Sequence, residues 1–230
     1  MNLNELKKQA AEKAVTFVRS EMVVGLGTGS TAVHAVRAIG RLLQEGQLQN
    51  IIAIPTSEAT AAEARRWHIP LTSLDEHPVV DLTIDGADEI DPTLNLIKGL
   101  GGALLREKIV AFSSRRLIII ADHTKAVSQL GTRAPVPVEV IPFARRPVTD
   151  YLSSLGTRVQ LRMNPDGKTP FYTDEGNLIL DCYFDNGIEN PTRLARALRA
   201  RPGVVEHGLF LNLAHMAILA SPDGLDIRQR

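Results

Sequence analysis

The chain has 230 residues, 44% of them hydrophobic, which is enough to bury a sizeable core and to build either one large domain or two modest ones. Lysine plus arginine and aspartate plus glutamate both number 26, and this balance does not favour nucleic acid or an anionic membrane surface as a partner. We therefore expect two domains and a small-molecule ligand.

The single cysteine, Cys182, excludes an intramolecular disulfide and leaves no CxxC pair for zinc or redox chemistry. We expect it to be a buried strand thiol in a reducing compartment. Residues 1–20 are charged and amphipathic, unlike a secretory signal, and no later segment approaches membrane-spanning length. These features predict a soluble, cytoplasmic protein.

The first half of the chain alternates between helical and strand patterns. Helices are expected at about residues 3–19, in the stretch GTGSTAVHAVRAIGRLL that starts at residue 27, and at 57–68 and 103–112. Short apolar strands are expected at about residues 22–26, 51–54, 79–84 and 116–122. This alternation indicates a Rossmann-like, doubly wound and mostly parallel sheet.

The pattern changes from about residue 131, where prolines become frequent. Strand patterns at 136–141, 158–163 and 177–184 alternate there with a helical pattern at 191–201, which predicts a small split β-α-β, ferredoxin-like α+β domain. A last strand at 215–221 is expected to rejoin the first sheet. We therefore expect a catalytic domain of residues 1–130 plus 207–230 and a smaller domain of residues 131–206.

The segment GLGTGSTA, residues 25–32, joins an expected strand to an expected helix. Its glycines permit a tight turn, and free amides at a helix N-terminus attract negative charge, so a phosphate is the natural ligand. Thr28, Ser30 and Thr31 add hydroxyl donors that suit a phosphate monoester, although Ser30 or Thr31 could instead be only a helix cap. Lys7 could approach the phosphate from the first helix, as could the adjacent lysine.

A second segment, residues 85–108, places Asp85, Asp88, Glu89 and Asp91 after an apolar strand and ahead of a glycine-rich turn. Ligands of open α/β sheets bind at the carboxyl ends of strands, and the amides of such a turn can hold an anion. The alternative is a solvated acidic turn.

Glu107 is the candidate general base. On a helix it shares a stripe with small apolar residues such as Val110 and Ala111, which could partly desolvate the carboxylate and raise its pKa. The alternative is an ordinary amphipathic glutamate in contact with solvent. Lys98 and Lys125 are expected in loops after sheet elements, where either could offset the acids or bind an oxyanion.

Other kinds of site have less support. The six histidines form no HxH or HExxH pair, and the chain has no G-x-S-x-G nucleophile elbow. Asp85, Asp88 and Asp91 could chelate magnesium, but Gly86 is in the wrong place for a calcium-hand loop and nearby lysines would compete. We expect no required metal.

The motifs GTGSTA, DGADEID, KGLGGALLREKI and ADHTK occur in the order found in the type A ribose-5-phosphate isomerases, and the chain resembles this family over essentially its whole length. The resemblance implies interconversion of D-ribose 5-phosphate and D-ribulose 5-phosphate in the non-oxidative pentose phosphate pathway, by a homodimer or homotetramer without a metal or organic cofactor. The residues that it implies for substrate binding are Thr28, Gly29, Ser30, Thr31, Asp85, Gly86, Ala87, Asp88, Lys98, Gly99, Leu100, Gly101 and Lys125. It implies that Glu107 accepts the proton.

An aldose–ketose isomerase moves a proton between neighbouring carbons, and one carboxylate can serve both. We expect Glu107 to do this, Lys98 to stabilise the enediolate, and Asp85, ahead of Asp88, to open the sugar ring. The chain departs from the family pattern K-G-G-G-G-A at Leu100. A positive φ there would be strained, whereas an ordinary φ would imply a slightly different loop.

Two other functions use some of the same features. A module that senses sugar phosphates without chemistry would keep the phosphate loop but need no Glu107, and would usually accompany a DNA-binding segment, which is not evident. A nicotinamide-dependent oxidoreductase would need an acidic residue at the end of the second strand, which instead reads IPTS, and a third glycine where Ser30 stands.

Overall fold

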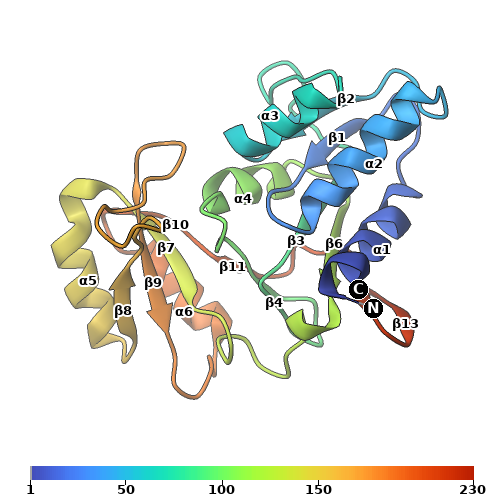
Figure 1. Ribbon diagram of the computed structural model, residues 1–230. Coiled ribbons are helices and arrows are strands. Elements are labelled where there is room, and N and C mark those ends of the chain that lie inside the picture. The colour runs from blue at the N-terminus through green and yellow to red at the C-terminus, as the bar shows by residue number, and fades with distance from the viewer. Residues whose placement is uncertain (1) are drawn as a thin grey trace. The chain divides into compact units, whose positions relative to one another are not determined.

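The computed structural model describes residues 2–230, which form two compact units (Figure 1). Unit 1 consists of residues 2–87, Arg106–Ala126 and Asn212–Arg230, and unit 2 of Asp88–Leu105 and Val127–Leu211. The segment Asp88–Leu105 thus groups with unit 2, whereas we expected it in the catalytic domain. The expected domain division remains a prediction.

A six-stranded sheet forms the centre of unit 1, with the strand order β13-β12-β6-β3-β1-β2. Its strands are β1 (Val23–Leu26), β2 (Ile52–Pro55), β3 (Leu82–Gly86), β6 (Leu117–Asp122), β12 (Met216–Ser221) and β13 (Gly224–Gln229). All neighbours are parallel except β12 and β13, which pair as an antiparallel hairpin. The expected mostly parallel, Rossmann-like sheet is confirmed, with β13 as an additional edge strand.

The helices that cover this sheet are α1 (Leu3–Val15), α2 (Ala32–Gln44), α3 (Glu58–Arg66) and α4 (Leu104–Phe112), and the 3-10 turn η1 (His123–Lys125) follows β6. Two of these helices, α1 and α3, begin at a side-chain cap. Asn2 and Glu5 form a reciprocal capping box at α1, and Ser57 caps α3 through the Thr60 N–H. Within residues 2–230, no helix is long and apolar enough to cross a membrane.

The core of unit 1 lies where α1 and α2 pack on the sheet. α1 buries Leu6, Ala10 and Ala14 in one cluster with Ile118 and Ile120 of β6. Strand β6 is buried along its full length, as expected for a parallel strand covered on both faces. The small side chains of Ala10 and Ala14 let α1 approach the sheet closely.

The order of the strands defines where a ligand can bind. The chain passes from β1 to β2 on one side, and then to β3 on the other side of β1. The carboxyl ends of β1 and β3 therefore flank a topological switch point, the usual binding position in open α/β sheets. In register, Leu26 of β1 is opposite Ile84 of β3, so the loops after these strands start at the same level.

Unit 2 contains a four-stranded antiparallel sheet with the order β10-β7-β9-β8. Its elements in chain order are β7 (Val136–Val140), η2 (Pro142–Ala144), α5 (Arg145–Ser154), β8 (Arg158–Leu161), β9 (Leu178–Tyr183), α6 (Pro191–Arg199) and β10 (Val204–His207). The order βαββαβ confirms the ferredoxin-like α+β arrangement. As expected, Cys182 is a buried strand thiol, and burial raises its pKa to about 12.

Three of these elements, α5, β10 and η2, were not expected from the sequence. Pro147 made the first of them resemble a loop, but the proline lies in the first turn of α5, where backbone N–H groups have no helical partner and proline is tolerated. Unit 2 also contains an unexpected three-stranded antiparallel sheet with the order β11-β5-β4. Its strands are β4 (Glu89–Ile90), β5 (Leu96–Ile97) and β11 (Leu209–Phe210), too short to give a periodic signal.

Candidate active site

The loop after β1 in unit 1 carries the first group of candidate residues. The Thr28 hydroxyl lies 2.8 Å from the Thr56 and Ser57 hydroxyls and 3.0 Å from that of Thr60. Thr60 in turn donates to the Gly27 carbonyl at 3.1 Å. The start of α3 therefore holds the β1 loop in place. The Thr56 and Ser57 hydroxyls of the IPTS strand end are the sequence signal for this cluster, which the motifs alone do not indicate.

Asp85, near the end of β3, connects the two loops of the switch point. Its Oδ1 accepts the Thr28 N–H at 3.1 Å and the Gly86 N–H at 2.7 Å, and the residue is only 1% exposed. A Cβ at Gly27 would lie 2.1 Å from this same oxygen. Glycine at position 27 is thus required for the Asp85 carboxylate to approach the β1 loop. Ala87, two residues after Asp85, is half-buried.

The remaining loop residues lie at the N-terminus of α2. Gly29 has φ +116°, a conformation that side chains disfavour. Ser30 is exposed and accepts a hydrogen bond from Lys7 Nζ at 3.0 Å, so the first helix brings a positive charge to this loop. Thr31 is the N-cap residue, but its buried side chain makes no capping hydrogen bond, so capping does not explain that hydroxyl. The neighbouring Lys8 instead lies 3.8 Å from Glu12.

Glu107 lies at the beginning of α4 and is 4% exposed, so the alternative of a solvent-facing glutamate is wrong. Two contacts place this helix on the sheet. Arg106 pairs with Glu58 at 2.8 Å, which holds the first turn of α4 next to the first turn of α3, beyond the carboxyl end of β2. One turn after Glu107, Val110 packs so closely on β1 that a Cβ at Gly25 would lie 2.8 Å from it. Glu107 is therefore buried at the loop-bearing edge of the sheet.

Lys125 ends the turn that follows β6. Asp122, the last residue of β6, caps this turn by accepting the Thr124 N–H at 3.0 Å. Because β6 is parallel to β3 and adjacent to it, Lys125 follows a strand end at the same edge of the sheet. In unit 1 the structure thus brings Thr28–Thr31, Asp85, Glu107 and Lys125 to one edge.

The other candidate residues belong to unit 2, where Lys98 follows β5. It is 2% exposed, its N–H donates to the Gly208 carbonyl at 2.9 Å, and its Nζ lies 5.3 Å from the centre of the Phe210 ring. A Cβ at Gly208 would lie 2.3 Å from the Lys98 carbonyl oxygen, so glycine permits this close approach. The three-stranded sheet therefore fixes both the backbone and the cation of Lys98.

The residues after Lys98 form a turn closed by a hydrogen bond from the Gly102 N–H to the Gly99 carbonyl, 3.0 Å long. Its positive φ values fall on glycines, +100° at Gly99 and +86° at Gly102, and not on Leu100 or Gly101. The possibility of strain at Leu100 is therefore wrong. The Leu100 side chain is 40% exposed, and its N–H donates to Asp88 Oδ2 at 3.0 Å.

Two of the acids in the 85–108 segment have structural roles instead. Glu89 is fully buried and accepts the N–H groups of Gly131 at 2.6 Å and of Ala134 at 2.7 Å. Asp91 Oδ1 accepts the N–H groups of Thr93 and Asn95, both at 2.8 Å, and so organises a tight turn. Across residues 2–230, no group of three or more His, Cys, Asp or Glu side chains is arranged to hold a metal ion.

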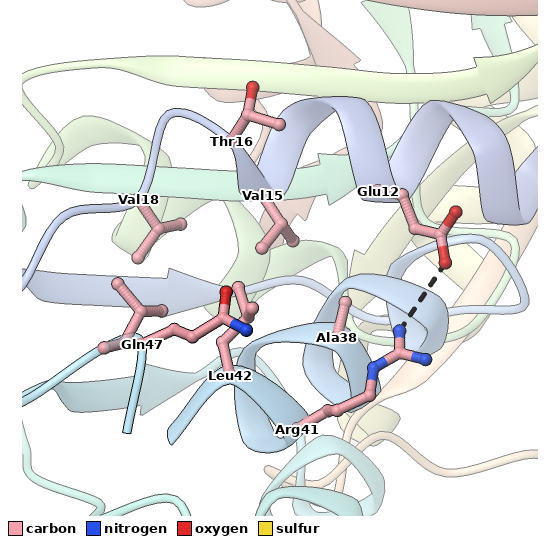
Figure 2. Close-up of a pocket in the computed structure, with 9 residues that line it drawn as sticks. Glu12, Val15, Thr16, Val18, Ala38, Arg41, Leu42 and Gln47 are labelled. Carbon is pink, nitrogen blue, oxygen red and sulfur yellow. Dashed lines mark hydrogen bonds and ion pairs between the residues drawn. The ribbon is translucent and has the colours of Figure 1, made fainter. Parts of the chain in front are cut away.

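Figure 2 shows a separate pocket of about 390 Å³ in unit 1, at α1 and α2. Its walls include Val15, Val18 and Leu42, and an ion pair between Arg41 and Glu12, 3.5 Å long, lies at its side. None of the motif residues lines this pocket. It is therefore distinct from the group at the carboxyl ends of β1 and β3.

Comparison with known proteins gives the same family as the motifs. A family model described as Ribose 5-phosphate isomerase A (phosphoriboisomerase A) matches residues 52–224. The chain is 53% identical over 219 residues to Ribose-5-phosphate isomerase A of Roseiflexus castenholzii, covering 95% of this chain and 93% of that protein. It is 47% identical over 237 residues to Probable ribose-5-phosphate isomerase 2 of Arabidopsis thaliana, covering 100% and 89%.

Solved structures agree over the full length. A D-ribose-5-phosphate isomerase in complex with phospho-erythronic acid has a TM-score of 0.97 and 39% identity, with 100% of both chains covered. The ribose 5-phosphate isomerase of Plasmodium falciparum has a TM-score of 0.96 and 40% identity, with 99% of both chains covered. With sequence relatives and solved structures agreeing over nearly all of its length, the chain belongs to the ribose 5-phosphate isomerase A family and is an isomerase.

Proposed function

We propose that this isomerase interconverts D-ribose 5-phosphate and D-ribulose 5-phosphate through an enediolate, with Glu107 as the base that moves the proton between C1 and C2. The observation that carries the proposal is the burial of Glu107, 4% exposed, at the sheet edge that also holds the β1 loop. A carboxylate shielded from water retains the proton that it removes and can return it to the neighbouring carbon.

The substrate phosphate binds, in this proposal, at the β1 loop and the N-terminus of α2. Backbone amides and the partial positive charge of a helix N-terminus favour an anion there. Lys7, 3.0 Å from the Ser30 hydroxyl, adds a full positive charge. Lys125, after β6, adds a second cation at the same edge of the sheet. Binding energy from the phosphate then orients the reacting carbons.

Asp85 is the group that we propose for opening the furanose ring. Two backbone N–H donors, from Thr28 and Gly86, fix its Oδ1, so the carboxyl group has one orientation. Proton transfer to or from a ring oxygen needs such a fixed geometry. Asp88, oriented by the Leu100 N–H, is the second choice for this step.

Lys98 is proposed to stabilise the oxyanion of the enediolate. Its burial and its position beside the Phe210 ring restrict the cation to few conformations. Loss of a preorganised donor of this kind costs roughly 10²–10³ in rate. The D-ribose-5-phosphate isomerase with a TM-score of 0.97 was solved with phospho-erythronic acid, whose carboxylate resembles an enediolate in charge and shape. We propose that this compound also binds here.

The wider biological proposals rest on the family resemblance. They are activity in the non-oxidative pentose phosphate pathway, a cytoplasmic location, assembly as a homodimer or homotetramer, and chemistry without a metal or organic cofactor. Analytical ultracentrifugation tests the assembly, because a monomer at micromolar concentration would contradict it.

The decisive experiment replaces Glu107 with Gln and follows both turnover and the incorporation of solvent deuterium at C2 of the substrate. We expect turnover and exchange to fall together by roughly 10²–10⁴, the usual contribution of a positioned general base. Glu12→Gln, on α1 and outside the candidate group, is the control and should retain wild-type rates. Exchange and turnover near wild type in Glu107→Gln would refute the assignment of the base.

A further inference from the structure

Arg162 of unit 2 makes contacts that the motifs did not indicate. It directly follows β8, and its side chain is 11% exposed. Its Nη1 donates to the Gly99 carbonyl at 2.8 Å and to the Leu100 carbonyl at 3.0 Å. One nitrogen of a largely covered guanidinium thus binds two consecutive carbonyls of the turn that follows Lys98.

The rest of the guanidinium is held by Asp181 of β9. Nε donates to Asp181 Oδ2 at 2.9 Å, and Nη2 donates to Oδ1. These two parallel hydrogen bonds fix the plane of the guanidinium. A lysine ammonium group could not pair with the carboxylate in this two-point geometry. The Arg162 backbone is also fixed, since its N–H donates to the Ile179 carbonyl and its carbonyl accepts the Phe171 N–H, both at 2.9 Å.

Phe171 supports the turn at a second point. A Cβ at Gly102 would lie 2.4 Å from Cζ of the Phe171 ring, so the ring lies directly against the glycine. Both ends of the turn are therefore held by a pair of residues, Arg162 and Phe171, that lie opposite each other on two antiparallel segments. Sixty or more positions along the chain separate these supports from the turn that they contact.

The carbonyl contacts determine where the amides of the turn point. In a trans peptide the C=O and N–H bonds point in opposite directions. Holding the Gly99 carbonyl toward Arg162 therefore directs the Leu100 N–H away from it, and this N–H reaches Asp88 Oδ2 at 3.0 Å. Holding the Leu100 carbonyl in the same way directs the Gly101 N–H away from the guanidinium.

We propose that Arg162, whose guanidinium is held by Asp181, is a positioning residue for the isomerase reaction. It orients two peptide planes of the turn. As a result, the Leu100 amide fixes Asp88, and the Gly101 amide faces an oxyanion of the sugar phosphate. The inference rests on the proposed function for the identity of the substrate. The effect of Arg162 on the order of the turn is independent of the proposed function, because that order can be measured without any ligand.

The first test compares Arg162→Met with the matched control Arg158→Met. Arg158 begins the same strand, but its guanidinium stacks on Tyr183, 4.0 Å from the ring centre. Hydrogen–deuterium exchange without ligand should become about tenfold faster at the Leu100 and Gly102 amides in Arg162→Met and stay unchanged in Arg158→Met. Unchanged exchange at these amides in Arg162→Met would overturn the inference.

The second test separates positioning from simple stability. Arg162→Met alone leaves Asp181 buried without its partner, which destabilises the sheet, whereas an apolar pair of similar volume is often tolerated. The double variant Arg162→Met with Asp181→Leu should therefore regain the thermal unfolding midpoint while kcat/KM for ribose 5-phosphate stays about 10–100-fold reduced. Recovery of kcat/KM together with the midpoint would show a purely structural role and overturn the inference.

The two proposals fail in different ways. If the wild-type protein does not isomerise ribose 5-phosphate, the proposed function is wrong, and the exchange comparison still decides whether Arg162 orders the turn. If the wild type is active and Arg162→Met has normal loop exchange and normal kcat/KM, the positioning role is wrong and the isomerase assignment stands.

Discussion

Two glycine-rich segments of this isomerase, for which we propose a role in substrate binding, are stabilised by different means. The β1 loop joins a buried parallel strand to a helix, and hydroxyl groups at the next strand end hold Thr28. The turn Gly99–Gly102 follows a two-residue strand and depends on Arg162 and Phe171, which are distant in the sequence. A loop that joins regular elements keeps its conformation when distant residues are substituted. A turn held by distant side chains can lose its conformation when one of those side chains is substituted.

Among changes within these two segments and their supports, the largest effect is expected at the β1 loop, from Gly27→Ala. The new Cβ would lie 2.1 Å from Asp85 Oδ1 and 2.5 Å from the Asp85 Cα, so the loop or β3 must move. We expect kcat/KM to fall about 100-fold, because moving the loop or β3 to relieve this clash disturbs both the β1 loop and Asp85. Steady-state kinetics on the folded variant provide the measurement. A fall in kcat/KM of less than threefold would show that the β1 loop can shift to accommodate the new Cβ, as an ordinary surface turn does.

A smaller effect is expected for the cation that serves the same loop. Lys7→Met removes the ammonium group that lies 3.0 Å from the Ser30 hydroxyl, and we expect KM to rise about three- to tenfold with kcat nearly unchanged. The difference from wild type should shrink as salt is added, because the contact is exposed and screened. Lys8→Met is the matched control, since Lys8 lies near Glu12 instead. An equal rise of KM in Lys7→Met and Lys8→Met would mean that only the net charge of the protein, and not the Lys7 contact, affects substrate binding.

The smallest effect is expected for Leu100→Gly, which restores the glycine of the family pattern in the turn. Leu100 has no positive φ and its side chain is 40% exposed, so glycine relieves no strain and empties little packed space. We expect kcat/KM to stay within about threefold of wild type and the free energy of unfolding to fall by roughly 0.5–1 kcal/mol, through the greater entropy of the unfolded chain. Chemical denaturation and kinetics measure both. A tenfold gain in kcat/KM would show that Leu100 does restrict the substrate loop.

Features with local signals could be predicted from the amino-acid sequence. Alternating periodicities predicted the mostly parallel sheet, and the strands on which the β1 loop, Asp85 and Lys125 depend form close to their expected positions. Hydrophobic spacing records which face of an element is buried, and glycine records where the backbone needs unusual angles, so both can be recognised from one chain. The same kind of pattern left Glu107 open between a desolvated base and a solvent-facing carboxylate, and the structure shows it buried.

Which polar groups meet depends on the folded chain. The four acids Asp85, Asp88, Glu89 and Asp91 stand close together in the sequence, and only the family resemblance separated Asp85 and Asp88 from the other two. In the structure, contacts with Gly131 and Ala134 make Glu89 structural, while the Leu100 amide orients Asp88. Arg162 carried no local signal, because an arginine after a strand is common and its role arises only when Asp181 fixes the guanidinium plane. Hydrogen bonds are short-ranged and directional, so partners brought together across many residues become visible only once the chain has folded.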